Sequence, residues 1–154
     1  MIFVEKAIPE DAKYLADIQK ASFDDESRRF NNQEAGGPPG YDSEEWQKDI
    51  MNHGQYFKIV LDLETVGGAI IFIDQQQVHC LGRIYIDPAH QNQGIGSQAI
   101  SAIEGKFPNA RTWWLETPKW SIKNHHFYEK CGYHKVGEQN DEFIFEKHMP
   151  YIAD

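Results

Sequence analysis

The stretch DPAHQNQGIGSQAISAIEGKF (residues 87–107) joins a polar loop to an apolar helical stripe through two closely spaced glycines. Gly94 and Gly96 stand where the helix is expected to begin, and apolar side chains follow at helical spacing until Pro108 ends the pattern. Glycine lets a ligand approach the backbone closely, and the start of a helix carries partial positive charge. The stretch therefore predicts an anion site. Which phosphate that site binds distinguishes one candidate fold from another.

Gly94, Gly96 and Ala99 also fit the G-x-G-x-x-A pattern of dinucleotide-binding folds, and Glu116 follows about twenty residues later. That pattern requires the first glycine to follow its strand directly, whereas the segment 88–93 intervenes here. The preceding chain also reads as antiparallel strands, not as parallel crossovers. A nicotinamide-dependent dehydrogenase is therefore the weakest of the alternatives.

Hydrophobic periodicity and turn residues predict a mixed α/β chain, in which short polar links between three central strands favour antiparallel pairing. We expect strands at 1–7, 56–63, 65–74, 78–87, 111–117, 133–138 and 142–148. Helices are expected at about 9–23, in a short segment that begins at Asp42 and ends at Gly54, at 95–107, and at 121–131 with Gly132 as its C-terminal cap. The polar segment 24–41, with its paired glycines and prolines, is expected to be a long loop.

Composition limits the partners and the location of the chain. Its 154 residues suit one domain, 1–154, and contain neither a membrane-spanning apolar run nor a secretory signal, so we expect a cytoplasmic protein. The two cysteines, Cys80 and Cys131, are expected to be reduced. A net charge of −9 argues against a nucleic-acid partner and mildly favours a cationic small molecule.

Two motifs carry a resemblance to a known family. The spacing Gln91-x-x-Gly94-x-Gly96 matches the (Arg/Gln)-x-x-Gly-x-(Gly/Ala) signature of the GNAT superfamily of N-acetyltransferases. The later stretch NHHFYEKCGYHKVG (residues 124–137) resembles the second signature of that family, and the likeness covers roughly 78–136. The resemblance implies an α/β fold of the α+β type, with a mixed, mainly antiparallel twisted sheet flanked by helices and a splayed central strand pair.

The resemblance also implies that acetyl-CoA (coenzyme A) is the cofactor, bound by three segments. The strand before the glycines would face the pantetheine arm, the loop amides would hold the pyrophosphate, and the later helix would supply a hydrogen bond and flanking contacts. The corresponding residues are Ile84, Tyr85, Ile86, Gln91, Asn92, Gln93, Gly94, Ile95, Gly96, Ser97, Asn124, Phe127 and Lys130.

Tyr128 matches the family tyrosine that serves as general acid. A phenol with a pKa near 10 can protonate a thiolate whose conjugate acid has a pKa near 8.5. An ordinary core tyrosine is the competing interpretation. Several family members carry a glutamate early in the strand 78–87, where this sequence has His79 and Cys80. His79 and Glu116 are therefore the candidate general bases, directly or through water, although a histidine in a strand is more often structural.

In this family the first two helices and the loop between them commonly build the acceptor pocket. Aromatic and acidic groups occur there and would suit a cationic amine, although a solvated loop explains them as well. The predicted substrate-binding residues are Phe30, Tyr41, Trp46 and Trp120, with Asp24, Asp25 and Glu26 beside them. No metal site is expected, because His125 and His126 are adjacent on a helix and face different ways.

The sequence thus predicts an acetyl-CoA-dependent N-acetyltransferase acting by direct transfer on a primary amine of a small molecule or peptide. The alternative is a non-catalytic acyl-CoA-binding or regulatory protein of the same fold. We expect no nucleic-acid and no membrane partner. The acceptor, the base, a homodimer and a preference for another acyl group stay open.

Overall fold

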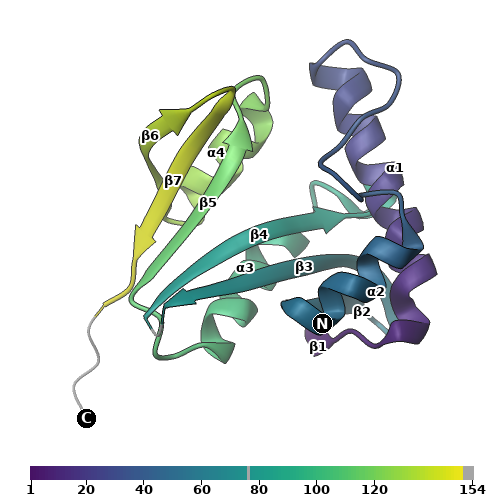
Figure 1. Ribbon diagram of the computed structural model, residues 1–154, viewed down its shortest axis with the longest axis horizontal. Helices are drawn as coiled ribbons and strands as arrows, with labels where there is room; N and C mark the ends of the chain where they lie inside the picture. The colour runs from purple at the N-terminus through teal and green to yellow at the C-terminus, as the bar shows by residue number, and fades with distance from the viewer. Residues whose placement is uncertain (76, 151–154) are drawn as a thin grey trace.

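The computed structural model describes residues 1–75 and 77–150 (Figure 1). Four α-helices lie within these residues: α1 (Ala12–Phe30), α2 (Glu44–His53), α3 (Ile95–Lys106) and α4 (Ile122–Lys130). The strands are β1 (Ile2–Lys6), β2 (Gln55–Leu61), β3 (Glu64–Gln75), β4 (Val78–Ile86), β5 (Thr112–Pro118), β6 (His134–Gln139) and β7 (Glu142–His148). All the predicted strands and helices are present, most of them within one or two residues of the expected ends.

The strands form one sheet in the order β1-β2-β3-β4-β5-β7-β6 within the described part of the chain. Every neighbouring pair is antiparallel except β4 and β5, which run parallel and are joined through α3. The mainly antiparallel sheet predicted from the sequence is confirmed.

The parallel pair separates soon after it begins. Val78–Cys80 of β4 lie opposite Thr112–Trp114 of β5, and no later residue of β4 is paired with β5. On its other edge β4 stays paired with β3 as far as Ile86, opposite Gly67. Figure 1 shows the two strands diverging toward the ends that precede α3 and α4. The splayed central pair is therefore also confirmed.

Helices cover both faces of the sheet and bury two apolar clusters. On one face α3 and α4 pack against the sheet around Ile100, Trp113 and Tyr128. On the other face α1 and α2 pack around Leu15, Ile70 and Tyr85. Tyr85 of β4 belongs to one cluster and Tyr128 of α4 to the other. The splay between β4 and β5 therefore lies where the two helix-covered clusters meet.

The helix predicted at 9–23 extends further than expected, so the prediction of a loop from residue 24 is wrong at its start. α1 continues to Phe30. It carries the ion pairs Lys20–Asp24 and Asp25–Arg29, and the two partners of each pair lie one helical turn apart. Asp24 is buried, and its Oδ1 accepts hydrogen bonds from the Gly36 amide (3.0 Å) and the Tyr41 hydroxyl (2.7 Å). Polar contacts stabilise this end of the helix. Such contacts produce no periodic pattern of apolar residues in the sequence, so the pattern does not reveal these turns.

Ser43, not Asp42, caps α2, because its hydroxyl accepts the Trp46 amide at 3.1 Å. Cys80 and Cys131 are free thiols. In the described ranges, the helices are all too short or too polar to span a membrane.

Candidate functional site

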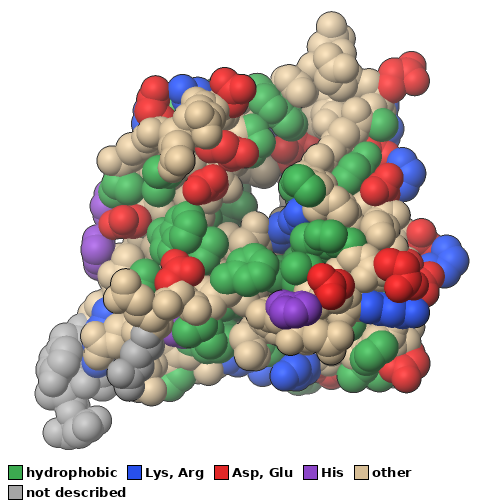
Figure 2. Space-filling model, in the orientation of Figure 1, with side chains coloured by type: hydrophobic (Ala, Val, Ile, Leu, Met, Phe, Trp, Pro, Cys, Tyr) green, Lys and Arg blue, Asp and Glu red, His purple; other side chains and the backbone are tan. Residues whose placement is uncertain are grey.

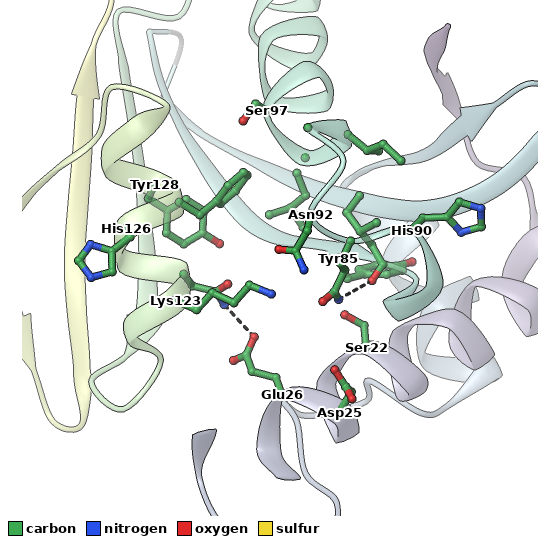
Figure 3. A pocket seen from close by; sticks show the side chains of 18 of the residues that line it. Ser22, Asp25, Glu26, Tyr85, His90, Asn92, Ser97, Lys123, His126 and Tyr128 are labelled. Atoms are coloured by element: carbon green, nitrogen blue, oxygen red, sulfur yellow. Dashed lines mark hydrogen bonds between the residues drawn. The ribbon is translucent and has the colours of Figure 1, made fainter. Parts of the chain in front are cut away.

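A cleft of about 570 Å³ opens at the splay, and it is lined by α1, the end of β4, the loop into α3, and α4. Figure 2 shows the molecule hollowed between the side that carries β5 to β7 and the side that carries α1. Figure 3 shows polar side chains from all four parts pointing into this space. Segments that are distant in sequence therefore meet at one concave site, the usual setting of a ligand pocket.

The glycine loop has the geometry that its sequence predicted. Asn92 and Gly94 adopt left-handed backbone angles, with φ of 63° and 77°, and the Gln91 side chain donates to the Ile86 carbonyl at 3.0 Å. The Gln98 amide donates to the Gly94 carbonyl at 3.2 Å, which is the first hydrogen bond of α3. The amides of the three residues 95–97 precede this bond and have no partner inside the helix, so they are available to an anion at its start.

Gly96 also brings α3 close to α4. A Cβ atom at this position would lie 2.9 Å from Cζ of Phe127 and 3.0 Å from its Cε1, closer than atoms pack. Gly96 therefore keeps the start of α3 in contact with the helix that carries Tyr128.

Tyr128 projects from α4 into the cleft (Figure 3). Only 8% of the residue is exposed, and its hydroxyl has no hydrogen-bond partner among the residues that the structure describes. Burial, with smaller contributions from Glu26 and Cys131, raises the pKa of this phenol above its ordinary value. The phenol is therefore protonated at neutral pH and free to donate to a ligand.

Glu26 of α1 faces Tyr128 from the opposite wall. Its Oε1 accepts the Ser121 hydroxyl and its Oε2 accepts the Asn124 side-chain amide, both at 2.9 Å. Burial raises the pKa of Glu26, while these two hydrogen bonds oppose the shift. A carboxylate thus connects α1 to α4 across the mouth of the splay.

Residues 15–133 match the Acetyltransferase (GNAT) family over most of the chain. The chain belongs to the GNAT family. A Bacillus subtilis relative, the uncharacterized protein YrkN, is 38% identical over 94 residues, which are 60% of this chain. The chain spans about half of that relative, since the match covers 48% of it.

Solved structures share the GNAT fold. The PaiA N-acetyltransferase of Thermoplasma acidophilum, crystallised with coenzyme A, superposes with a TM-score of 0.83 over 97% of this chain and 99% of its own, at 17% identity. A GNAT acetyltransferase of Elizabethkingia anophelis with acetyl-CoA bound gives 0.65 over 96% and 98%, at 15% identity. At such identity the likeness concerns the fold alone.

The GNAT cleft gathers most of the cofactor residues expected from the sequence. Lining it are Ile84, Tyr85, Ile86, Gln91, Asn92, Gly94, Ile95, Gly96, Ser97, Asn124, Phe127 and Lys130, together with Tyr128 and Phe30. Gln93 does not line it. The side-chain nitrogen of Asn124, expected to meet the cofactor arm, is bound to Glu26, which leaves its Oδ1 for a ligand.

The two candidate bases lie elsewhere in the GNAT fold. His79 is buried in the core, with its ring 5.2 Å from that of Phe107 and 5.3 Å from that of Trp113. Glu116 is exposed on β5. Neither side chain lines the cleft. The geometry therefore gives no support to either as a base.

In the described residues no three His, Cys, Asp or Glu side chains are grouped to hold a metal ion.

Three of the predicted acceptor residues also stand back from the cleft. Tyr41 is bound to Asp24, Trp46 stacks 4.1 Å from the Arg83 guanidinium, and Trp120 is half-buried beyond β5. None of the three lines the cleft. Glu26, expected from the sequence near the acceptor in a loop, lines the cleft from helix α1 instead. It lies four residues after Ser22, a cleft residue, and an offset of four puts both on one face of a helix.

Two alanine variants separate the two glycines of α3. Gly96→Ala should be less stable than Gly105→Ala by at least about 1 kcal/mol, because alanine favours a helix at both positions but meets Phe127 only at 96. A Cβ atom at 105 has nothing within 4 Å. Urea unfolding of both variants measures the difference, and equal stabilisation would contradict the close contact.

Proposed function

We propose that the protein transfers an acetyl group from acetyl-CoA to a primary amine of a small molecule or peptide, within one acetyltransferase domain, 1–154. Membership of the GNAT family supports acetyl transfer. The observation that carries the proposal is the convergence of an unpaired strand edge, unpartnered helix-start amides and a protonated phenol on one cleft.

The cleft fits an acyl-CoA. The amides of 95–97 can bind the pyrophosphate without a lysine, since the helix start adds favourable charge and Gly94 leaves the approach open. The β5-facing edge of β4 is unpaired beyond Cys80, so its backbone groups near Ile84 and Ile86 can bind the amides of the pantetheine arm. When bound, acetyl-CoA supplies an acetyl group activated as a thioester.

Tyr128 supplies the proton that the leaving sulfur needs. Its phenol faces the cleft, has no hydrogen-bond partner among the described residues and keeps its proton at neutral pH because burial disfavours the phenolate. Turnover requires a proton donor for the leaving thiolate and binding alone does not, so this observation favours the enzyme over the non-catalytic alternative.

A thiol-release assay tests the function. The protein is incubated with acetyl-CoA and, in turn, polyamines, amino sugars, amino acids and peptide amines, and free thiol is measured with the acetylated product. Release that depends on one amine class supports the proposal. Tight acetyl-CoA binding with no amine-dependent release would instead support the non-catalytic alternative.

Gly94→Val should weaken acetyl-CoA binding at least tenfold while the helical content is retained. Valine strongly disfavours the positive φ of 77° at this position, so the amides that follow would turn away from the pyrophosphate. Calorimetric titration measures the affinity, with Gly105→Ala as a control variant away from the cleft. Unchanged affinity in Gly94→Val would remove the loop from the cofactor site.

Tyr128→Phe should lower kcat by roughly 10² to 10⁴ with little change in acetyl-CoA affinity, because the ring packing remains and only the donor is lost. Tyr133→Phe is the matched control, since Tyr133 is also buried in the same cluster but does not line the cleft. Steady-state kinetics on a verified acceptor compare the two variants. Wild-type kcat in Tyr128→Phe would leave the phenol as a packing residue.

A further inference from the structure

We propose that Glu26 is the group that binds the ammonium of the acceptor and accepts its proton, a role that rests on the proposed amine acetylation. Glu26 lines the cleft from α1, whereas Tyr128 and the start of α3 line it from the opposite side. In Figure 3 its carboxylate projects into the space below Tyr128. An amine held there lies between the carboxylate and the phenol.

The hydrogen bonds of Glu26 fix its carboxylate without using all its capacity. Ser121 donates to one oxygen and Asn124 to the other, each at 2.9 Å. A carboxylate can accept about four hydrogen bonds, so each oxygen keeps a lone pair for a ligand. Ser121 is itself buried, with 1% exposed, and provides a rigid contact on the α4 side. The carboxylate is thus held in position for an ammonium that enters the cleft.

The other ionisable bases of the cleft are engaged or point elsewhere. Asp25 pairs with Arg29 at 3.3 Å. His126 is 74% exposed, lies 3.7 Å from Glu129 and points away from the cleft in Figure 3. The Nε2 of His90 faces Glu64 at 4.0 Å, its Nδ1 is buried, and in Figure 3 its ring points away from Tyr128. Glu26 remains as the carboxylate that faces Tyr128.

The surroundings of Glu26 suit both parts of this role. Burial raises its pKa, the neighbouring charge of Asp25 raises it slightly, and Ser121, Asn124 and the positive charge of Lys123 lower it. Burial disfavours the ionised form of Glu26, and the positive charge of a bound ammonium stabilises that form. A carboxylate with a raised pKa is also a better base than an exposed one.

Glu26 and Tyr128 together account for every proton of the transfer. The ammonium loses one proton to the Glu26 carboxylate, and the neutral nitrogen forms the C–N bond as the C–S bond breaks. Tyr128 gives its proton to the departing sulfur, and the second proton that the nitrogen loses restores the phenol. Glu26 then releases its proton to water. One ammonium and one thioester thus give one amide, one thiol and one proton.

Glu26→Gln tests the assignment, because glutamine keeps the shape and can still bond Ser121 and a reoriented Asn124. We expect kcat to fall by roughly 10² to 10⁴ and KM for the amine to rise, with acetyl-CoA affinity unchanged by calorimetry. In the wild type the rate should rise with pH as Glu26 ionises, at a pH above the ordinary pKa of a glutamate because burial raises it. This rise should be absent in Glu26→Gln.

Two further variants separate catalysis from a structural bridge. Ser121→Ala removes one hydrogen bond to Glu26 but keeps its carboxylate, so kcat should fall about tenfold or less with the pH profile retained. Glu129→Gln makes the same substitution as Glu26→Gln on the exposed face of α4 and should behave as wild type. Thermal unfolding of all three variants checks that each is folded.

Each outcome decides the role. The role is supported if Glu26→Gln, and neither of the other two variants, loses turnover and the rise of the rate with pH. Equal small losses in Glu26→Gln and Ser121→Ala, with unchanged pH profiles, would reduce Glu26 to a bridge while amine acetylation still stands. A wild type that binds acetyl-CoA but acetylates no amine would overturn the proposed function, and the role of Glu26 with it.

Discussion

The early end of the pairing between β4 and β5 is the constraint on which the site depends. The pairing is confined to Val78–Cys80 and Thr112–Trp114, so beyond it β4 has an edge of backbone groups without a strand beside them. Such groups need partners, and a ligand with amide groups of its own can supply them. The same divergence separates the α1 side from the α4 side and creates the space between them.

An open edge is useful only if the strand that carries it is held in place, and the other contacts of β4 do this. Its far edge pairs with β3 as far as Ile86. The Tyr85 hydroxyl lies 2.6 Å from that of Tyr56, which in turn donates to Gln47 of α2. Arg83 donates to Gln19 of α1 at 2.9 Å and to the Pro39 carbonyl at 2.6 Å. Buried polar groups on one side thus fix the strand that is open on the other.

The sequence predicted the parts of the site whose signals are local. Gly94 and Gly96 mark the start of α3 because the backbone there needs a positive φ at one glycine and a close helix contact at the other. The placement of Glu116 could not be read from its distance along the chain. On β5 the side chains alternate, so Trp113, Leu115 and Thr117 are buried and Glu116 points to the opposite face. His79 is buried against Phe107 and Trp113, contacts that depend on the tertiary structure.

The last turns of α1 escaped prediction because they are polar, and that polarity is what connects the two halves of the cleft. Asp24 holds the segment after α1 through Gly36 and Tyr41, and Ser27 donates to the Gly36 carbonyl at 3.0 Å. Glu26, between them, turns to the other side and binds Ser121 and Asn124 next to α4. The polar end of α1 thus binds both the segment that follows it and the start of α4. Because β4 and β5 are unpaired beyond Cys80, the side-chain hydrogen bonds of Glu26 connect the two sides of the cleft there.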